Sequence, residues 1–152
     1  MSLPSIQIRR ADWGDLRAIE GVVESAYAKY VQRIGRRPGP MEVDYAEALA
    51  RADVFVGVDG ETVAGLSVLA PQSDHLLIEN VAVLPSHQGR GFGRALLAHA
   101  EEWARRQGHR RLRLYTHESM VENIALYERL GYREERRASK NGFTLVFMVK
   151  HV

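Results

Sequence analysis

The sequence contains no cysteine among its 152 residues. Disulfides, thiolate-bound zinc sites and a cysteine acyl-enzyme are therefore excluded. Long apolar runs are also missing, since none approaches the length that spans a membrane. The start, MSLPSIQIRR, lacks the apolar core of a signal peptide. We therefore expect a cytoplasmic protein that has no membrane partner.

A large excess of charge of one sign is also absent. The formal net charge is only +2, so the pI of about 9.1 is weak evidence for nucleic-acid binding. The paired arginines at 105–106 and 110–111 flank an expected helix end, where cations suit the helix dipole. A solvated helix end is the favoured interpretation, and we expect no nucleic-acid partner. The histidines show no metal-ligand spacing, so no metal is expected; they are His75, His87, His99, His109, His117 and His151.

Length and composition predict one globular domain over residues 1–152, with 45% apolar and 26% charged residues. Apolar periodicity predicts the elements, and Asp12 is a plausible N-cap for the first helix. That helix buries one face through Tyr30, and the later helices are expected from Pro40 or Met41 through Ala50, over Phe92–Arg106 and over Val121–Leu130. The expected strands are Ile6–Arg10, Asp53–Val58, Thr62–Leu69, Leu76–Val83, Arg111–Thr116, Tyr132–Arg136 and Phe143–Lys150.

Two dipeptides in this chain are strong hairpin signals. Asp59-Gly60 lies between the second and third expected strands, and Asn141-Gly142 lies between the last two. The resulting order, β-α-α-β-β-β-α-β-α-β-β, indicates an α/β fold whose strands run in mixed directions. We find no internal repeat, linker or low-complexity segment.

The most informative stretch is a buried strand, a glycine-rich turn and the start of an amphipathic helix, over residues 76–97. Gly89, Gly91 and Gly93 remove side chains where the backbone must approach something closely. The helix N-terminus adds unpaired N–H groups and a partial positive charge, which suits a phosphate. Arg90 and Arg94 are placed to add charge-assisted contacts to the same anion.

The spacing separates this turn from other phosphate loops. The third glycine of a dinucleotide-binding loop is missing, and no Gly-Lys-Ser/Thr follows as in a Walker loop. The pattern present is Gln88-x-x-Gly91-x-Gly93 after a strand ending in Val-Ala-Val, followed later by Leu126-Tyr127-x-x-x-Gly131-Tyr132. Over roughly residues 6–150, this resembles the GNAT N-acetyltransferase superfamily. The alternative is an ordinary strand, loop and helix with incidental glycines.

The resemblance implies a mixed, splayed central sheet flanked by helices, with the glycine turn holding the pyrophosphate of acetyl-coenzyme A. The implied turn contacts are Gln88, Gly89, Arg90, Gly91, Phe92, Gly93 and Arg94. Backbone N–H groups around Val81 would hold the thioester oxygen. The backbone of Val81, Ala82 and Val83 would pair with the pantetheine arm like an added strand.

Two side chains are the candidates for chemistry. Glu79 interrupts an apolar strand, and an acidic residue at this place in the family often acts as base, commonly through water. The alternative is a structural carboxylate paired with an arginine; Glu118 and Glu122 are reserves. Tyr127 is the candidate for a hydrogen bond to the departing thiolate, with a core-capping tyrosine as the alternative.

The chain departs from the family pattern before that tyrosine. Met120 occupies the position of the usual asparagine, and Asn123 stands where a small residue is usual. Asn123 still has the chemistry to hydrogen-bond the cofactor. An acceptor should lie against the first helices, near Tyr27, Tyr30, Arg33 and Arg37, although core tyrosines and solvated arginines are the favoured interpretation.

The function implied by the resemblance is direct, acetyl-coenzyme A-dependent transfer of acetyl to a primary amine of a small molecule or peptide. The alternative is a module that senses acetyl-coenzyme A without catalysis. Because family members often form dimers, a homodimer is also an expectation.

Overall fold

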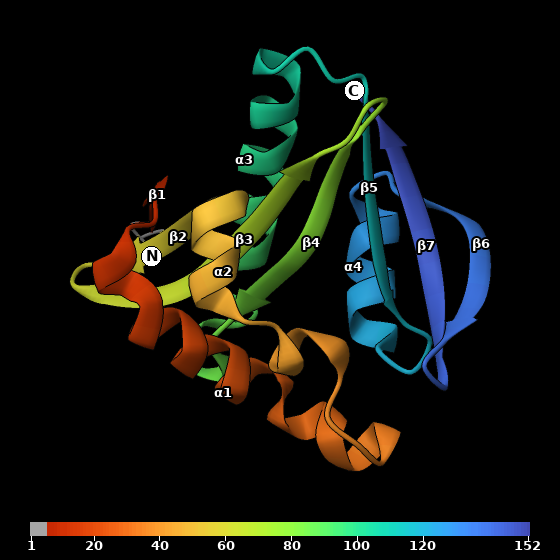
Figure 1. Ribbon diagram of the computed structural model, residues 1–152, viewed down its shortest axis with the longest axis horizontal. Helices are drawn as coiled ribbons and strands as arrows, with labels where there is room; N and C mark the ends of the chain where they lie inside the picture. The colour runs from red at the N-terminus through yellow and green to blue at the C-terminus, as the bar shows by residue number, and fades with distance from the viewer. Residues whose placement is uncertain (1–5) are drawn as a thin grey trace.

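The computed structural model describes residues 6–152, and they form a seven-stranded sheet with the order β1-β2-β3-β4-β5-β7-β6 (Figure 1). Residues 1–5, where the expected domain and the segment inspected for a signal peptide begin, lie outside the described residues. Within residues 6–152, no helix combines the length and the apolarity that crossing a membrane requires. The strands are β1 (Ile6–Arg10), β2 (Asp53–Asp59), β3 (Thr62–Pro71), β4 (Leu76–Val83), β5 (Arg111–His117), β6 (Arg133–Lys140) and β7 (Phe143–His151).

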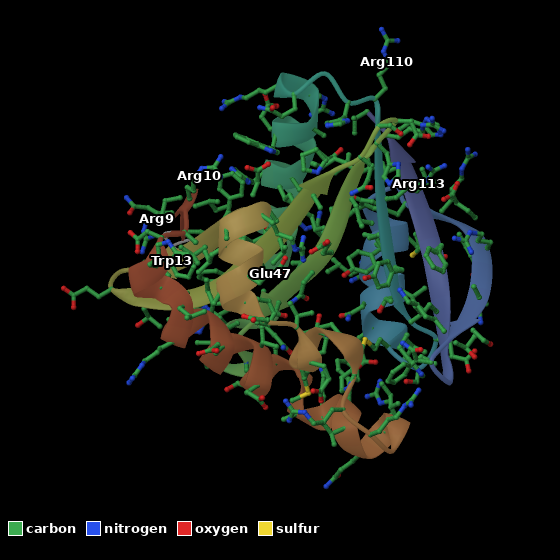
Figure 2. The ribbon with its side chains drawn as sticks, viewed as in Figure 1. Arg9, Arg10, Trp13, Glu47, Arg110 and Arg113 are labelled. Atoms are coloured by element: carbon green, nitrogen blue, oxygen red, sulfur yellow. The ribbon has the colours of Figure 1, made fainter. Side chains whose placement is uncertain are left out.

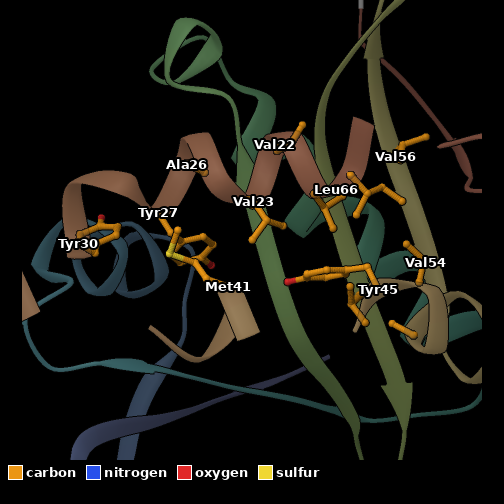
Figure 3. Close-up of a cluster of buried hydrophobic side chains, with 14 of the residues drawn as sticks. Val22, Val23, Ala26, Tyr27, Tyr30, Met41, Tyr45, Val54, Val56 and Leu66 are labelled. Atoms are coloured by element: carbon orange, nitrogen blue, oxygen red, sulfur yellow. The ribbon is translucent and has the colours of Figure 1, made fainter. Parts of the chain in front are cut away.

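The helices lie in two layers. Helices α1 (Leu16–Ile34) and α2 (Tyr45–Arg51) cover one face of β2–β4, as Figures 1 and 3 show. The apolar face expected for the first helix is buried there against β-strand residues such as Val56 and Leu66. Helices α3 (Phe92–Arg106) and α4 (Val121–Arg129) lie on the opposite face. The mixed α/β class is confirmed, because β4–β5 is parallel and the other neighbours are antiparallel.

The sheet opens between β4 and β5. These strands pair only where residues 76–78 meet residues 112–114, and Figure 1 shows them diverging beyond that point. On the other edge of β4, Leu69 pairs with Ile78 and Val68 pairs with Asn80. Glu79 is therefore the extra residue of a β-bulge. The expected splay is confirmed, and the bulge turns β4 at the place where it leaves β5.

Two expected boundaries are corrected. The helix expected from Pro40 or Met41 through Ala50 is broken, because a 3-10 turn over Gly39–Glu42 ends before Asp44. The Asp44 side chain accepts from the N–H groups of Ala46 and Glu47 at 3.0 and 3.2 Å, so α2 begins only at Tyr45.

The other correction concerns the last hairpin. Strand β6 extends to Lys140, beyond the expected end at Arg136. Asn141 and Gly142 adopt φ values of 52° and 79°, so they form a tight turn that lets Lys140 pair with Phe143.

Asp12 is an N-cap as expected, but it caps a 3-10 turn over Trp13–Asp15 that leads into α1.

Gly65 allows β3 to approach β4 and α3 closely. A Cβ at this position would lie 2.9 Å from the Ala82 carbonyl oxygen and 3.0 Å from Leu96 Cδ1. We expect Gly65→Ala to lower the free energy of unfolding by about 2 kcal/mol, because backbone and buried side chain must both shift. Gly21→Ala is the control, since a Cβ there meets nothing within 4 Å on α1 and should stabilise by about 1 kcal/mol. Urea unfolding measures both, and equal effects of the two changes would contradict the close approach.

Candidate active site

The glycine turn lies between the end of β4 and α3. Gly89 and Gly91 adopt φ values of 75° and 92°, a left-handed conformation that favours glycine. Gly91 is the N-cap of α3 and provides no side-chain cap, so the first N–H groups of the helix are left for another partner. A cavity of about 430 Å³, the turn cavity, opens here and is lined by Gln88, Gly89, Gly91, Gly93 and Arg94, among others.

Three side chains of the turn have partners inside the protein. Gln88 Nε2 donates to the Val83 carbonyl at 3.1 Å and so holds the turn against the end of β4. Arg90 Nη2 lies 3.7 Å from Asp59 Oδ2, and its guanidinium carbon is 5.7 Å from the centre of the Phe92 ring. The Phe92 side chain is buried in the core. Of the residues proposed for phosphate contact, Phe92 therefore has only its backbone to offer, and Arg90 is directed toward β2.

A second cavity, the sheet cavity, has a volume of about 310 Å³ and lies at the splay. Its walls include Glu79 and Asn80 from β4, together with Tyr115 from β5. Both cavities share lining residues: Tyr27, Val81, Asn123 and Tyr127. A molecule in the turn cavity and another in the sheet cavity would therefore meet at these residues.

Glu79 faces the sheet cavity and is held by α2. Arg51 Nη1 and Nη2 donate to its two carboxylate oxygens at 3.1 and 3.0 Å, and Arg51 Nε donates to Glu47 at 2.9 Å. Figure 2 shows Glu47 on α2, in front of the sheet. The Glu79 side chain keeps 24% of its surface exposed. The arginine partner that we considered for a structural carboxylate is present, and the same carboxylate borders the cavity.

A buried hydrogen-bond chain beside the bulge was not expected from the sequence. Tyr27 donates to Asn80 Oδ1 at 2.5 Å, Asn80 Nδ2 donates to Tyr45 at 3.0 Å, and Tyr45 donates to the Pro40 carbonyl at 2.6 Å. Figure 3 shows the Tyr45 hydroxyl directed toward β4. Burial raises the pKa of Tyr45 to about 12 and the pKa of Tyr27 well above its usual value, so both remain donors. The sequence signal was Asn80, a polar residue in an apolar strand.

Tyr127 lies on α4 at the junction of the two cavities. Burial, followed by the nearby Tyr30, raises the pKa of its hydroxyl to about 12, so the phenol stays protonated at neutral pH. Its ring packs edge-on against Tyr132, with centroids 5.9 Å apart. Within residues 6–152 the hydroxyl has no hydrogen-bond partner. It is therefore a donor available to a bound molecule.

We expect Tyr127→Phe to lower kcat about 30-fold in the acetyl transfer that the sequence resemblance implies, because one hydrogen bond to a developing charge is lost. Thermal unfolding should be unchanged, since the hydroxyl has no partner in the described protein. Since a pKa of about 12 keeps the phenol protonated, the unmodified protein should show no loss of kcat from this group as the pH rises from neutral to mildly alkaline. A kcat that stays within a factor of about two would favour the core-capping alternative.

Met120 and Asn123, the two residues before Tyr127 that depart from the family pattern, have different surroundings. Met120 is buried, and its sulfur accepts a hydrogen bond from Thr116 Oγ1 at 3.3 Å, so this position contributes to the core. Asn123 lines both cavities, and its Nδ2 lies 3.8 Å from the Met120 sulfur. Asn123 therefore remains available for contact with a bound molecule.

The reserve carboxylates and the arginines near α1 pair with one another or with other side chains. Arg33 donates to both Glu122 oxygens, at 2.6 and 3.1 Å, and these hydrogen bonds lower the pKa of Glu122 to about 2. Arg37 is paired with Glu24 and Glu42. Tyr30 is buried. These contacts agree with the favoured interpretation that the tyrosines belong to the core and the arginines to the surface. The other reserve carboxylate, Glu118, lies 3.7 Å from Arg137.

Within residues 6–152, no three histidine or acidic side chains gather as a metal site would need.

Comparison with known proteins shows which family this chain belongs to. A family model described as "Acetyltransferase (GNAT) family" matches residues 19–132. The chain belongs to the GNAT family. The glycine turn and α4 through Tyr132 both fall inside the matched region, so the motifs that suggested the family are part of the match.

Individual GNAT relatives agree with this assignment. A streptothricin acetyltransferase of Streptomyces lavendulae is 35% identical over 88 residues, which cover 57% of this chain and 46% of that protein. The IAA acetyltransferase from Bacillus cereus has a TM-score of 0.74 and 25% identity, covering 97% of this chain and 100% of that one. A PaiA N-acetyltransferase from Thermoplasma acidophilum, solved with coenzyme A, shares the fold with a TM-score of 0.79 and 19% identity, covering 97% and 99% of the two chains. The chain spans 21% to 57% of the first curated relatives it matches.

Proposed function

We propose that this chain is an acetyl-coenzyme A-dependent N-acetyltransferase that passes acetyl directly to a primary amine of a small molecule or peptide. The observation that carries the proposal is the meeting of the two cavities at Tyr127 and Val81, where the sheet opens. One cavity begins at an uncapped helix N-terminus and the other borders a carboxylate. Family membership and the coenzyme A bound to the Thermoplasma protein of the same fold support this assignment.

The cofactor would lie along the turn cavity. Its pyrophosphate suits the glycine turn, where Gly89, Gly91 and Gly93 leave backbone N–H groups uncovered and Arg94 adds a positive charge. Beyond Ile78 the backbone of β4 pairs with β3 on one edge only. The pantetheine arm would pair as an added strand with the edge of β4 at residues 81–83 that does not pair with β3.

The acceptor amine would enter from the sheet cavity. An unperturbed alkyl amine with a pKa of about 10.4 is protonated at pH 7, and its deprotonation costs about 4.6 kcal/mol. Glu79 would take that proton, directly or through a water, because each of its oxygens keeps a lone pair beyond the bond to Arg51. The amine nitrogen would then bond to the acetyl carbon as the carbon–sulfur bond breaks, and the second proton that the nitrogen loses would pass to the departing sulfur, directly or through water. Tyr127 would donate a hydrogen bond to the thiolate that leaves.

Incubation with acetyl-coenzyme A and an amine panel tests this function. We expect release of free thiol together with acetylated amine of the matching mass. A protein that binds acetyl-coenzyme A in calorimetry but produces no acetylated amine would instead be the sensing module. A cytoplasmic location, a homodimer and the absence of nucleic-acid or metal partners remain predictions.

A further inference from the structure

The polar side chains of the bulge, on the wall of the sheet cavity, already have partners in the protein. Asn80 is bonded on both sides by tyrosine hydroxyls, and Glu79 is held by Arg51. Farther along the wall, His117 Nδ1 lies 2.8 Å from Ser119 Oγ, and Thr116 donates to a methionine sulfur. A second polar group that an acceptor places against these paired side chains would find few free partners, and burying it without one would cost binding free energy.

The remaining wall is aliphatic and aromatic. Phe143 and Leu145 from β7 and Val43 before α2 contribute side chains to it, together with the ring of Tyr115. Tyr115 is 38% exposed, which places apolar area in contact with solvent at the cavity. Such a wall gains free energy by covering an apolar body of the acceptor.

A clasp joins the segment after α1 to the β6–β7 hairpin, and both of these segments contribute residues to the lining of the sheet cavity. The guanidinium carbon of Arg36 lies 3.5 Å from the centre of the Phe143 ring, and Arg36 also donates to the Asn141 carbonyl. Gly142 makes this contact feasible, because a Cβ there would lie 2.9 Å from Arg36 Nη2. Pro38 and Pro40, which follow Arg36 in the chain, also line the cavity. Loosening the clasp should therefore let these two segments separate and admit a longer acceptor.

We propose that the acceptor is a small primary amine on an apolar body about the size of one aromatic ring, with no second charged group. This inference rests on the proposed function and specifies its substrate class. The amine faces Glu79 and the junction at Tyr127, and the apolar body packs against the wall formed by Tyr115, Phe143 and Leu145. Peptides and amines that carry an acid are the competing classes.

Two amines with the same phenylethylamine scaffold test the charge preference: 2-phenylethylamine and 4-(2-aminoethyl)benzoic acid, which adds a carboxylate at the far end of the ring. We expect kcat/KM to be at least about 10-fold higher for 2-phenylethylamine. The same preference should appear as a ratio of dissociation constants in calorimetry on the coenzyme A-loaded protein. If the protein turned over neither amine, that result would contradict the proposed function. The ratio of the dissociation constants for the two amines would still decide the substrate class.

Lys140 provides the sharpest way to contradict the proposal. It lines the same cavity, and within residues 6–152 no carboxylate lies within salt-bridge distance of it. If the acid were preferred and Lys140→Met abolished that preference, Lys140 would be a carboxylate-binding residue and the uncharged class would be wrong. If the proposal is right, Lys140→Met leaves the ratio for the two amines in favour of 2-phenylethylamine.

The clasp is tested separately with Arg36→Ala. We expect the unmodified protein to favour 2-phenylethylamine over a tetrapeptide with an N-terminal phenylalanine by at least about 10-fold, and Arg36→Ala to reduce this ratio at least about 3-fold. Arg17→Ala, at an exposed position on α1, is the matched control and should leave the ratio unchanged. A tetrapeptide turned over better than the amine by the unmodified protein would overturn the small-molecule class.

Discussion

Glu79→Gln is expected to lower kcat about 100-fold at neutral pH, with the KM for acetyl-coenzyme A changed less than about 3-fold. Glutamine keeps the shape of the side chain and can still accept a hydrogen bond from Arg51, but it cannot take a proton from the acceptor. The turn cavity does not include Glu79 among its lining residues, so cofactor binding should be spared. Steady-state kinetics with an amine accepted by the unmodified protein measures both constants.

A matched control exists elsewhere in the sheet. Arg113 Nε and Nη2 donate to the two oxygens of Glu135 at 2.9 and 3.2 Å, which makes a bidentate ion pair, as Arg51 makes with Glu79 through Nη1 and Nη2. Figure 2 shows Arg113 on β5. Glu135→Gln should therefore change the free energy of unfolding about as much as Glu79→Gln while leaving kcat unchanged. If the two variants lose activity equally, Glu79 is a structural carboxylate, and its pairing with Arg51 is its main role.

The sequence predicted the glycine turn and the order of helices and strands along the chain well, because both depend on local signals. Glycine spacing and apolar periodicity are recorded in neighbouring residues, and the structure has the expected turn between β4 and α3, with positive φ at Gly89 and Gly91. The cavity at the splay could not be predicted in this way, because it depends on how distant parts of the chain pair. The bulge at Glu79 is defined by which residues of β3 face it, and that register is not recorded in β4 alone.

Side-chain partners were the least predictable part of the site. The family pattern implied that Gln88, Arg90 and Phe92 all contact the cofactor. They lie close together in the sequence, but their side chains point in different directions. Gln88 bonds to the end of β4, Arg90 turns toward Asp59, and Phe92 packs into the core. The pairing of Arg51 with Glu79 joins residues that are 28 positions apart, so only the folded chain brings them together.

Gly91→Val should raise the dissociation constant for acetyl-coenzyme A about 30-fold. A β-branched residue is strongly disfavoured at the φ of 92° that Gly91 adopts, so the turn should relax to a different backbone conformation. That change would redirect the N–H groups at the start of α3, on which the proposed phosphate binding depends. A Cβ at Gly91 meets nothing within 4 Å, so the loss would come from backbone conformation and not from a steric clash.

Gly108→Val separates this effect from general strain. Gly108 lies just beyond the other end of α3, has a φ of 83°, and likewise leaves open space for a Cβ. Both variants should lose similar stability in urea unfolding, but only Gly91→Val should weaken the binding of acetyl-coenzyme A in calorimetry. If Gly91→Val binds the cofactor as tightly as Gly108→Val, the uncovered amides of the turn do not hold the pyrophosphate. The cofactor would then have to be held by the free edge of β4 and by Arg94, whose charge could be tested by the salt dependence of binding.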